Sequence, residues 1–389
     1  MVPISYFCPM RVLIAPDKFK GSLTATDVAN GVQKALLACQ PTLELVVKPV
    51  ADGGEGTAEV LTTATNGQLR TITVNDPLFR RVEATYGISG DGQTAFVEMA
   101  QASGLHLLTS DERNPLLAST FGTGELIRNA IGQGVREVVL CIGGSATTDA
   151  GMGMAAALGY EFLDKKNTPL PAIGQSMRHI DRIRRVSLDV DLRRVRFRVA
   201  CDVENPLFGP HGAAYIYGPQ KGATHQMVTE LDKGLRVIDR ILKRDFGIDE
   251  AEQPGSGAAG GLGFGARVFL KATFQNGFEL VSETLDIATE VSRADLIITG
   301  EGSLDEQTLD GKVVAGITRL ARNHRVPVVA FCGRLALSQE QLQSLGIAEA
   351  IPITPVSMPL SEAMSQAQLL LGRAVREWAT GQLGQYDKK

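Results

Sequence analysis

Residues 11–37 read RVLIAPDKFKGSLTATDVANGVQKALL and decide the fold of this chain. The opening RVLIA run is apolar and β-branched, which predicts a strand covered on both faces. Pro16 keeps the residue before it out of the helical region and Gly21 can take a positive φ, so a turn follows the strand. A helix begins at Thr24, whose hydroxyl can accept from backbone N–H groups while Asp27 completes a capping-box pattern.

The loop between this strand and helix carries four polar side chains, Asp17, Lys18, Lys20 and Ser22. In open parallel sheets, ligands bind outside the carboxyl ends of the strands, which is where this loop emerges. Two lysines beside a helix N-terminus suit an anion, because the helix end is itself electropositive. The loop therefore predicts an anion site, with a solvated surface turn as the alternative that the loop alone leaves open.

A second strand, loop and helix follow at once. LELVVKPV at 43–50 predicts a strand, ADGGEGT a loop, and the residues through about Asn66 a helix. A strand, helix and strand at this spacing form a βαβ unit, whose crossover is almost always right-handed. Both loops then emerge on the same edge of the sheet, so we expect the basic loop at 17–22 to lie near the acidic loop at 52–56.

The composition is that of a globular protein with two domains. A chain of 389 residues is long for one core, and its 44% hydrophobic and 21% charged residues are close to globular averages. The net charge of −4 argues against nucleic acid as a partner, because phosphate backbones require a basic surface. No apolar run approaches the roughly 20 residues that span a bilayer, so we expect no membrane segment.

The cysteines are odd in number, scattered, and never spaced as CxxC: they are Cys8, Cys39, Cys141, Cys201 and Cys332. This pattern predicts thiols in a reducing compartment, so we expect a cytoplasmic protein without disulfides or a zinc site. Residues 1–9 lack the basic and apolar regions of a signal peptide, and they read as a dispensable leader or an alternative start.

The pattern of apolar and polar residues changes at Asn75, and the earlier pattern returns near residue 291. The residues after Asn75 alternate apolar and polar positions with Gly-rich turns, which predicts antiparallel hairpins. ADLIITGEGSLDEQTLDGKVVAGITRLA at 294–321 repeats the opening order of strand, loop and helix. The predicted fold class is α/β, with a discontinuous parallel-sheet domain at 10–75 and 291–389 and a second, inserted α/β domain at 76–290.

Three local predictions concern the inserted domain. A helix is expected to begin near Thr148, and residues 226–245 predict a charged amphipathic helix. The segment at 252–267 is the most Gly-rich of the chain, which predicts irregular backbone and not a helix interior.

Acidic side chains follow five strand-like runs: Asp17, Asp52 with Glu55, Asp149, Asp202 with Glu204, and Glu301 with Asp305. A single such residue is weak evidence, because Asp commonly caps helices, and capping is the main alternative for Asp149. If the loops converge, a divalent cation or Lys18, Lys20 and Lys312 must neutralise their charge. Mg²⁺ takes carboxylate oxygens and binds together with phosphates.

Three Gly-rich loops complement these acids, at 53–56, 143–151 and 257–265. Successive backbone N–H groups in such loops form nests that bind phosphate or carboxylate. Anion nests, lysines and an acidic metal site together predict phosphoryl transfer, in which positioning and charge stabilisation dominate.

Several other chemistries lack their motifs. The chain has no GxxxxGK[ST], no HRD–DFG series and no GxSxG, which excludes Walker-type NTPases, protein kinases and the common serine-hydrolase elbow. Two loose GxGxxA matches at 151–156 and 261–266 do not follow a strand directly, as a dinucleotide site requires. Ser145 has no histidine near it in sequence, but His211 could reach it through the fold, so a hydrolase stays open.

Six motifs in order resemble those of the bacterial glycerate kinase family. They are IAPDKFKGSL at 14–23, VADGGEGT at 50–57, GGSATTDAG at 143–151, CDVENPL at 201–207, GAAGGLG at 257–263 and TGEGSLDEQT at 299–308. The resemblance implies ATP- and Mg²⁺-dependent phosphorylation of D-glycerate to 2-phosphoglycerate, in glyoxylate, glucarate or galactarate breakdown. It also implies a discontinuous flavodoxin-like domain and a distinct α/β domain, with the active site in the interdomain cleft.

The resemblance leaves the roles of single residues open, so we assign them as hypotheses from their chemistry. Lys18 and Lys20 would hold the γ-phosphoryl group or the glycerate carboxylate, and Ser22 would donate a hydrogen bond to the same anion. Asp202 would be the base that orients the glycerate hydroxyl, with Asp149 as the alternative. The predicted metal ligands are Asp52, Glu301 and Asp305. The predicted phosphate- or substrate-binding nests contain Gly53, Gly54, Gly143, Gly144, Ser145, Gly260 and Gly261.

Two other classes of function stay open. A metal-dependent phosphatase or hydrolase could use the same acids and would release phosphate without an acceptor alcohol. A non-catalytic sugar-acid sensor would bind glycerate without forming ADP, although a mere binder needs no metal cluster. The expected partners are D-glycerate and ATP. The oligomeric state is open, with a homodimer as one option.

Overall fold

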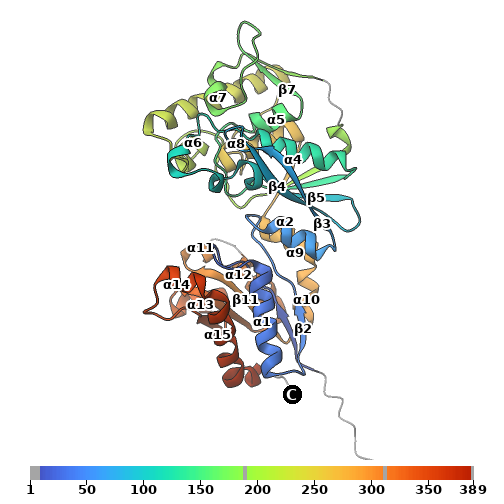
Figure 1. Ribbon diagram of the computed structural model, residues 1–389, viewed down its shortest axis with the longest axis vertical. Coiled ribbons are helices and arrows are strands. Elements are labelled where there is room, and N and C mark those ends of the chain that lie inside the picture. The colour runs from blue at the N-terminus through green and yellow to red at the C-terminus, as the bar shows by residue number, and fades with distance from the viewer. Residues whose placement is uncertain (1–8, 187–190, 310–312, 387–389) are drawn as a thin grey trace, which may run out of the picture. The chain divides into compact units, whose positions relative to one another are not determined.

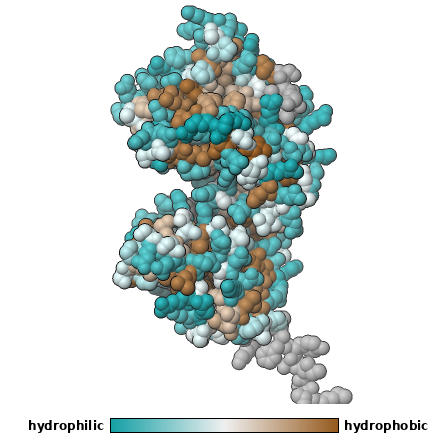
Figure 2. All heavy atoms as spheres, in the orientation of Figure 1, coloured by the Kyte–Doolittle hydropathy of each residue, from teal (hydrophilic) through white to brown (hydrophobic). Residues whose placement is uncertain are grey.

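The structure, a computed structural model, describes residues 9–186, 191–309 and 313–386 of the chain. It divides into two compact units (Figure 1): unit 1 comprises Met1–Asp52 and Phe278–Lys389, and unit 2 comprises Gly53–Gly277. Each unit combines helices with a sheet, which is parallel in unit 1 and mixed in unit 2, and this confirms the α/β class. Hydrophilic residues cover much of the face seen in Figure 2, with hydrophobic ones between them. Among the described helices, none is both long and apolar enough to cross a membrane.

Unit 1 is built on a five-stranded sheet with the order β13-β12-β11-β1-β2. All neighbouring strands are parallel, and they are β1 (Arg11–Ile14), β2 (Glu44–Val47), β11 (Leu296–Leu304), β12 (Val328–Leu335) and β13 (Glu349–Pro352). In register, Val12 of β1 lies opposite Leu296 on one side and Leu45 on the other. Counted along the chain this is the order 2-1-3-4-5 of a doubly wound sheet, in which the direction of winding reverses between β1 and β11.

Helices cover both faces of this sheet. They are α1 (Ala25–Cys39), α9 (Gly277–Leu285), α10 (Ile287–Arg293), α11 (Glu306–Leu309), α12 (Val313–His324), α13 (Gln339–Leu345), α14 (Leu360–Ser365) and α15 (Ala367–Gln382), with the 3₁₀ helix η6 (Leu383–Tyr386). Successive residues of β12 point to opposite faces, so Val329 and Phe331 pack with α1 and α15 while Ala330 and Cys332 pack with α12 and α13. Helices α1 and α15 therefore lie side by side although they come from opposite ends of the chain (Figure 1).

Helix α1 begins as the sequence predicts. The Asp27 backbone N–H donates to the Thr24 hydroxyl at 3.1 Å, and the Thr24 N–H donates to the Asp27 carboxylate at 3.3 Å, which completes the capping box. Val28, Val32 and Leu36 are buried on one helix face in the core that includes β1. A cap of this kind stabilises a helix by about 1 kcal/mol, so the turn from β1 into α1 is specified locally.

Unit 2 contains a six-stranded mixed sheet with the order β10-β9-β6-β5-β4-β3. Its strands are β3 (Gln68–Asn75), β4 (Arg81–Ile88), β5 (Thr94–Glu98), β6 (Glu137–Cys141), β9 (Arg196–Ala200) and β10 (Thr273–Gln275). Strands β5, β6, β9 and β10 are parallel, whereas β3, β4 and β5 pair antiparallel as the hairpin pattern predicts. The short strands β7 (Tyr160–Leu163) and β8 (Arg182–Arg185) form a separate antiparallel pair.

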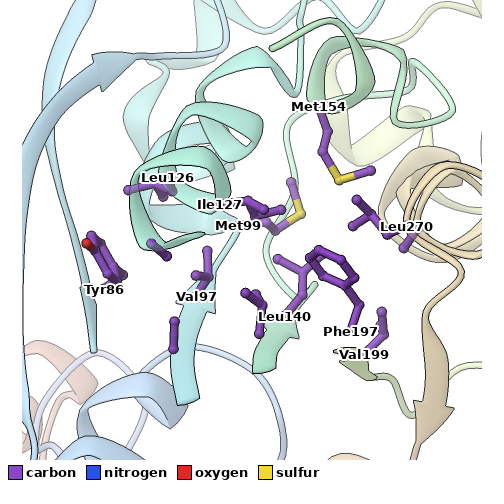
Figure 3. Packing of buried hydrophobic residues seen from close by; sticks show 14 of the residues in the cluster. Tyr86, Val97, Met99, Leu126, Ile127, Leu140, Met154, Phe197, Val199 and Leu270 are labelled. Atoms are coloured by element: carbon purple, nitrogen blue, oxygen red, sulfur yellow. The ribbon is translucent and has the colours of Figure 1, made fainter. Parts of the chain in front are cut away.

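Two hydrophobic cores organise the helices of this unit. The helices are α2 (Thr57–Ala64), α3 (Ala100–Ser103), α4 (Phe121–Gly132), α5 (Met152–Ala157), α6 (Ala213–Tyr217), α7 (His225–Phe246) and α8 (Ala258–Leu270), and the 3₁₀ helices are η1 (Leu105–Leu107), η2 (Ser110–Glu112), η3 (Gly174–His179), η4 (Leu192–Arg194) and η5 (Pro219–Lys221). In the core of Figure 3, Val97 and Leu140 of the sheet pack with Ile127 of α4. In the second core, Leu231 and Leu235 of α7 are fully buried, which confirms the predicted amphipathic helix.

The predicted domain boundaries differ from the two units. Asn75 lies at the end of β3, and β3 pairs with β4 along its whole length. The change in residue pattern at Asn75 therefore marks a hairpin inside unit 2. The chain instead passes between units at Asp52–Gly53 and at Gly277–Phe278, and residues 53–75 belong to unit 2. Hydrophobic alternation locates the strands, but it does not reveal which sheet each strand joins.

Two local predictions are wrong. The Gly-rich segment is largely helical, since α8 spans Ala258–Leu270, with a kink where Ala259, Gly260 and Gly261 take φ values of 52°, 69° and 88°. A Cβ on Gly260 would lie 1.9 Å from the carbonyl oxygen of Thr147, so a side chain there would prevent this close approach of α8. The helix expected near Thr148 begins only at Met152, because residues 148–151 form the loop that α8 packs against.

Candidate functional site

The loop after β1 extends the sheet edge before it turns into α1. The Asp17 N–H donates to the carbonyl oxygen of Gly300 in β11 at 2.8 Å, so this residue still follows the strand direction. The Lys18 ammonium lies 3.8 Å from the Asp17 carboxylate and 3.5 Å from the Asp52 carboxylate. The predicted proximity of the basic and acidic loops is therefore confirmed, and Lys18 is the residue that joins them.

The tip of the loop is a tight turn that presents Lys20 to solvent. Phe19 and Leu23 exchange backbone hydrogen bonds of 2.9 and 3.0 Å, and Gly21 takes a φ of 76°, which suits glycine. The Ser22 hydroxyl donates to the Phe19 carbonyl oxygen at 3.0 Å. In this conformation Ser22 closes the turn with its hydrogen atom, and it offers an approaching anion only oxygen lone pairs.

Two acids, Glu301 within β11 and Asp305 just after it, are held by one threonine. The Thr308 hydroxyl donates to Glu301 at 2.6 Å and accepts from the Asp305 N–H at 3.2 Å. The Asp305 carboxylate accepts from the Gln307 N–H at 3.0 Å, so it caps the start of α11. Lys312, one of the lysines expected to neutralise these acids, lies outside the described residues.

The three predicted metal ligands do not form a cage of their own. Among residues 9–186, 191–309 and 313–386, no group of three or more His, Cys, Asp or Glu side chains is placed to hold a metal ion. Asp52 contacts Lys18, and Glu301 is buried beside Thr308. Mg²⁺ is commonly bound by one or two carboxylates together with substrate phosphates. Asp52, Glu301 and Asp305 have the carboxylate oxygens that such an ion takes.

Polar groups also gather at the carboxyl ends of the parallel strands in unit 2. Asp202 follows β9 and is exposed, and its Oδ1 accepts hydrogen bonds of 2.7 Å from the Gly277 N–H and from the Asn276 amide. Glu98 ends β5 and accepts from the Ala58 N–H of α2 at 2.8 Å. Asp202 is thus an oriented and accessible carboxylate, whereas the buried Glu98 is a polar residue that the sequence pattern did not single out.

Asp149, the alternative base, is completely buried and holds its loop together. Its Oδ2 accepts from the N–H and hydroxyl of Thr120, both at 2.8 Å, and from the Gly153 N–H at 3.1 Å; its Oδ1 accepts from the Gly151 N–H at 3.1 Å. Burial raises the pKa of Asp149, and these hydrogen bonds oppose that shift. The contacts support the capping role that the sequence left open, because a side chain without solvent access is poorly placed to reach a substrate.

Lys221 lies against the same loop and had no signal in the sequence. Its side chain is fully buried, and its ammonium donates to the Ser145 hydroxyl and to the Thr147 carbonyl oxygen, both at 2.6 Å. Burial lowers the pKa of Lys221 to about 7, and the charge of Asp149 opposes this shift. Its surroundings, GPQKG, read as a surface turn, so only the tertiary structure reveals a buried cation beside Ser145.

The predicted glycine nests fall into two kinds. Gly143 and Gly144 are exposed at the end of β6, and Gly144 takes a φ of 74°, so their backbone is accessible to an anion. Gly260 and Gly261 are buried against the loop at 147–150, so they serve close packing. Gly53 is also buried, and a Cβ there would lie 2.9 Å from the Cα of Gly277, while Gly54 is partly exposed beside Gly143.

Two features of the GGSATTDAG loop bear on the hydrolase alternative. The Ser145 hydroxyl contacts Lys221, and no described contact joins it to His211. The hydroxyls of Thr147 and Thr148 are buried without a hydrogen-bond partner in the described structure. The loop therefore shows no Ser–His pair of the kind that activates a serine nucleophile.

Comparison with known proteins decides the family. The model of the glycerate kinase family matches residues 12–381 of the chain. The chain belongs to the glycerate kinase family. The family prediction from the six motifs is thus confirmed, and the chain is an enzyme of the kinase class.

Relatives within the glycerate kinase family match over their full length. A glycerate kinase of Halalkalibacterium halodurans is 43% identical over 368 residues, which cover 95% of this chain and 97% of that protein. Glycerate 2-kinase of Escherichia coli K12 is 40% identical over 370 residues, with the same two coverages of 95% and 97%. A crystal structure from Salmonella typhimurium LT2 that bears the name glycerate kinase 2 is 38% identical, covers 97% of this chain and 100% of its own, and superposes with a TM-score of 0.87.

Proposed function

We propose that the chain transfers the γ-phosphoryl group of ATP to the 2-hydroxyl of D-glycerate, giving 2-phospho-D-glycerate and ADP. The observation that carries the proposal is the match of a glycerate kinase family model to residues 12–381, which include every residue given a role below. The relative named glycerate 2-kinase, at 40% identity, supports the 2-hydroxyl as the acceptor.

Lys18 and Lys20 are the proposed phosphate-binding cations. Both follow β1 at the edge of the sheet where the direction of winding reverses, which is where open α/β sheets bind ligands. Lys18 is held by Asp17 and Asp52, so its ammonium is fixed in position, whereas Lys20 is exposed on a turn. A fixed cation stabilises the charge on the transferring phosphoryl oxygens without reorganising.

Asp202 is the proposed base. Its orientation by Gly277 and Asn276 through Oδ1 leaves the carboxylate in a defined plane. The reaction requires that the glycerate hydroxyl lose its proton as its oxygen bonds to the γ-phosphorus, while the bond from that phosphorus to the β–γ bridging oxygen breaks and ADP leaves. Asp202 would accept this proton. The exposed backbone of Gly143 and Gly144 would bind the substrate carboxylate or a phosphate.

We propose that one reaction uses residues of both units, and that unit 1, with its 2-1-3-4-5 strand order, is flavodoxin-like. Mg²⁺ would accompany ATP and neutralise phosphate charge, with Asp52, Glu301 and Asp305 as the candidate carboxylates. We also propose a reducing, cytoplasmic setting, because the cysteines are scattered along the sequence and never spaced as CxxC.

The test is ADP release by purified protein supplied with ATP and Mg²⁺, with D-glycerate, L-glycerate or no acceptor. ADP that forms only with D-glycerate would support the proposal. Phosphate release without an acceptor would identify the phosphatase instead. Glycerate binding without ADP formation would identify the sugar-acid sensor.

A further inference from the structure

Unit 1 contains an apolar cavity of about 760 Å³ whose apolar walls have no role in the reaction proposed above. Of its 17 lining residues, only Lys20, Ser22, Arg334 and Thr354 have polar side chains. Its volume is within the roughly 300–1,000 Å³ of small-molecule sites, and such sites typically combine apolar walls with a few polar groups. We infer that this cavity binds the adenosine part of a nucleotide, with its phosphates directed toward Lys20.

The position of the cavity in the fold is the first support. Its lining comes from the loop after β1, from Gly302 of β11, from Gly333 and Leu335 of β12, and from Pro352 at the end of β13. These residues lie at or near the carboxyl ends of four neighbouring parallel strands, beside the point where the sheet reverses its winding. Ligands of doubly wound sheets bind at this edge.

The charge at the cavity is the second support. Within the described part of the chain, neither Lys20 nor Arg334 has an ion-pair partner, and both are exposed. The turn predicted from the sequence to bind phosphate, with Lys20 and Ser22, therefore opens onto the cavity. An apolar pocket beside two unpaired cations is complementary to a ligand with a flat apolar ring at one end and negative charge at the other.

The walls are the third support. Val356, Leu360 and Met364 line the cavity and are exposed, which is unfavourable for large hydrophobic side chains unless something covers them. Met364 of α14 also packs over the phosphate turn, since a Cβ on Gly21 would lie 2.7 Å from its Cε. One flexible side chain thus touches both the proposed ring site and the proposed phosphate site.

This inference rests on the proposed function, which requires a nucleotide as phosphoryl donor. The test is a fluorescence titration with mant-ADP and the KM values for ATP and D-glycerate, measured on the full chain and on Thr354→Trp. Thr354 is half-buried in the wall, and the indole would fill the ring site. Leu369→Trp on α15, an exposed residue outside the cavity, is the matched control.

We expect Thr354→Trp to weaken mant-ADP binding and to raise the KM for ATP, each by at least about tenfold, because a blocked pocket loses most of its contacts. The KM for D-glycerate should change less than about threefold, and Leu369→Trp should behave as the parent. If Thr354→Trp unfolds, Arg334→Gln is the second variant. It should weaken binding of mant-ADP but not of adenosine, since it removes only charge.

Unchanged mant-ADP affinity and unchanged ATP KM in a folded Thr354→Trp protein would overturn the inference and leave the kinase proposal intact. Conversely, mant-ADP binding that is lost in Thr354→Trp, in a parent that never phosphorylates glycerate, would support the cavity and refute the function. Light scattering tests whether the cavity instead binds a second copy of the chain. A dimeric parent and a monomeric Thr354→Trp variant that still binds mant-ADP normally would show this and overturn the inference.

Discussion

Asp149 and Asp202 differ in burial and hydrogen bonding more than their sequence motifs indicate. Each follows a strand of the same six-stranded sheet, in a motif of the same family. Asp149 is completely buried and accepts four hydrogen bonds from its own unit, whereas Asp202 is exposed and its Oδ1 accepts from Gly277 and Asn276. The difference teaches that an acid after a strand can serve the loop or the substrate, and that burial separates the two roles.

The largest expected effect tests the exposed member of this pair. Asp202→Asn preserves the shape of the side chain and removes the base, so kcat should fall by about 10²–10⁴. The melting temperature should stay near that of the parent, because Oδ1 can still accept from Gly277. The measurement is a steady-state assay of ADP release together with thermal unfolding. A loss below about tenfold would show that another group takes the proton.

Lys18→Met should have the next largest effect. Lys18 is the cation fixed by Asp17 and Asp52, and removing one preorganised charge from a phosphoryl-transfer site should lower kcat by about 10²–10³. Lys20→Met, which removes an exposed cation, should cost less than Lys18→Met in kcat. Near-normal turnover in a folded Lys18→Met protein would contradict the assignment, and so would a larger loss in Lys20→Met.

Asp149→Ala tests the buried member of the pair through stability. The substitution leaves the buried donors of Thr120, Gly151 and Gly153 without their acceptor, so the free energy of unfolding should fall by about 3 kcal/mol. Chemical denaturation of this variant and of Asp202→Asn gives the comparison. An Asp149→Ala protein as stable as the parent but inactive would reverse the two roles.

The last prediction is a pH dependence at Lys221, which develops gradually with each pH unit. Because burial lowers the pKa of Lys221 to about 7 from 10.5, the unfolded chain binds more protons than the folded one between these values. The contribution of Lys221 to the free energy of unfolding should therefore increase as pH rises from 7 toward 10, by at most about 1.4 kcal/mol per pH unit. Unfolding curves of the parent and of Lys221→Met across this range should diverge, and parallel pH profiles would exclude a depressed pKa.

The sequence predicted the parts of the fold that are specified locally. The strand, turn and capped helix at 11–37 need only neighbouring residues, and the right-handed crossover placed the loops of Lys18 and Asp52 together. The predicted domain boundaries differ from the two units because the residues of β3 predict a strand but do not indicate which sheet it joins. The prediction of irregular backbone in the Gly-rich segment was wrong for most of α8, because residues such as Leu262 and Phe264 are buried in the cores of unit 2 and outweigh the low helix propensity of glycine.

The sequence predicted which loops carry the candidate site residues, but it did not predict which of those side chains are buried. The predicted loops that carry Lys18, Asp149 and Asp202 each follow a strand, but no pattern distinguishes the buried Asp149 from the exposed Asp202. Lys221 was missed because a buried lysine in a turn looks like a solvated one until Ser145 and Thr147 are placed around it. Burial of a charge depends on residues distant in sequence, which local patterning cannot report.

The most direct test of the account is phosphorus NMR of the product made by the parent protein from ATP, Mg²⁺ and D-glycerate. The proposed reaction joins phosphorus to the oxygen on C2, so its signal should couple to the single C2 proton. A signal that couples to the two C3 protons, or inorganic phosphate as the only product, would contradict the account.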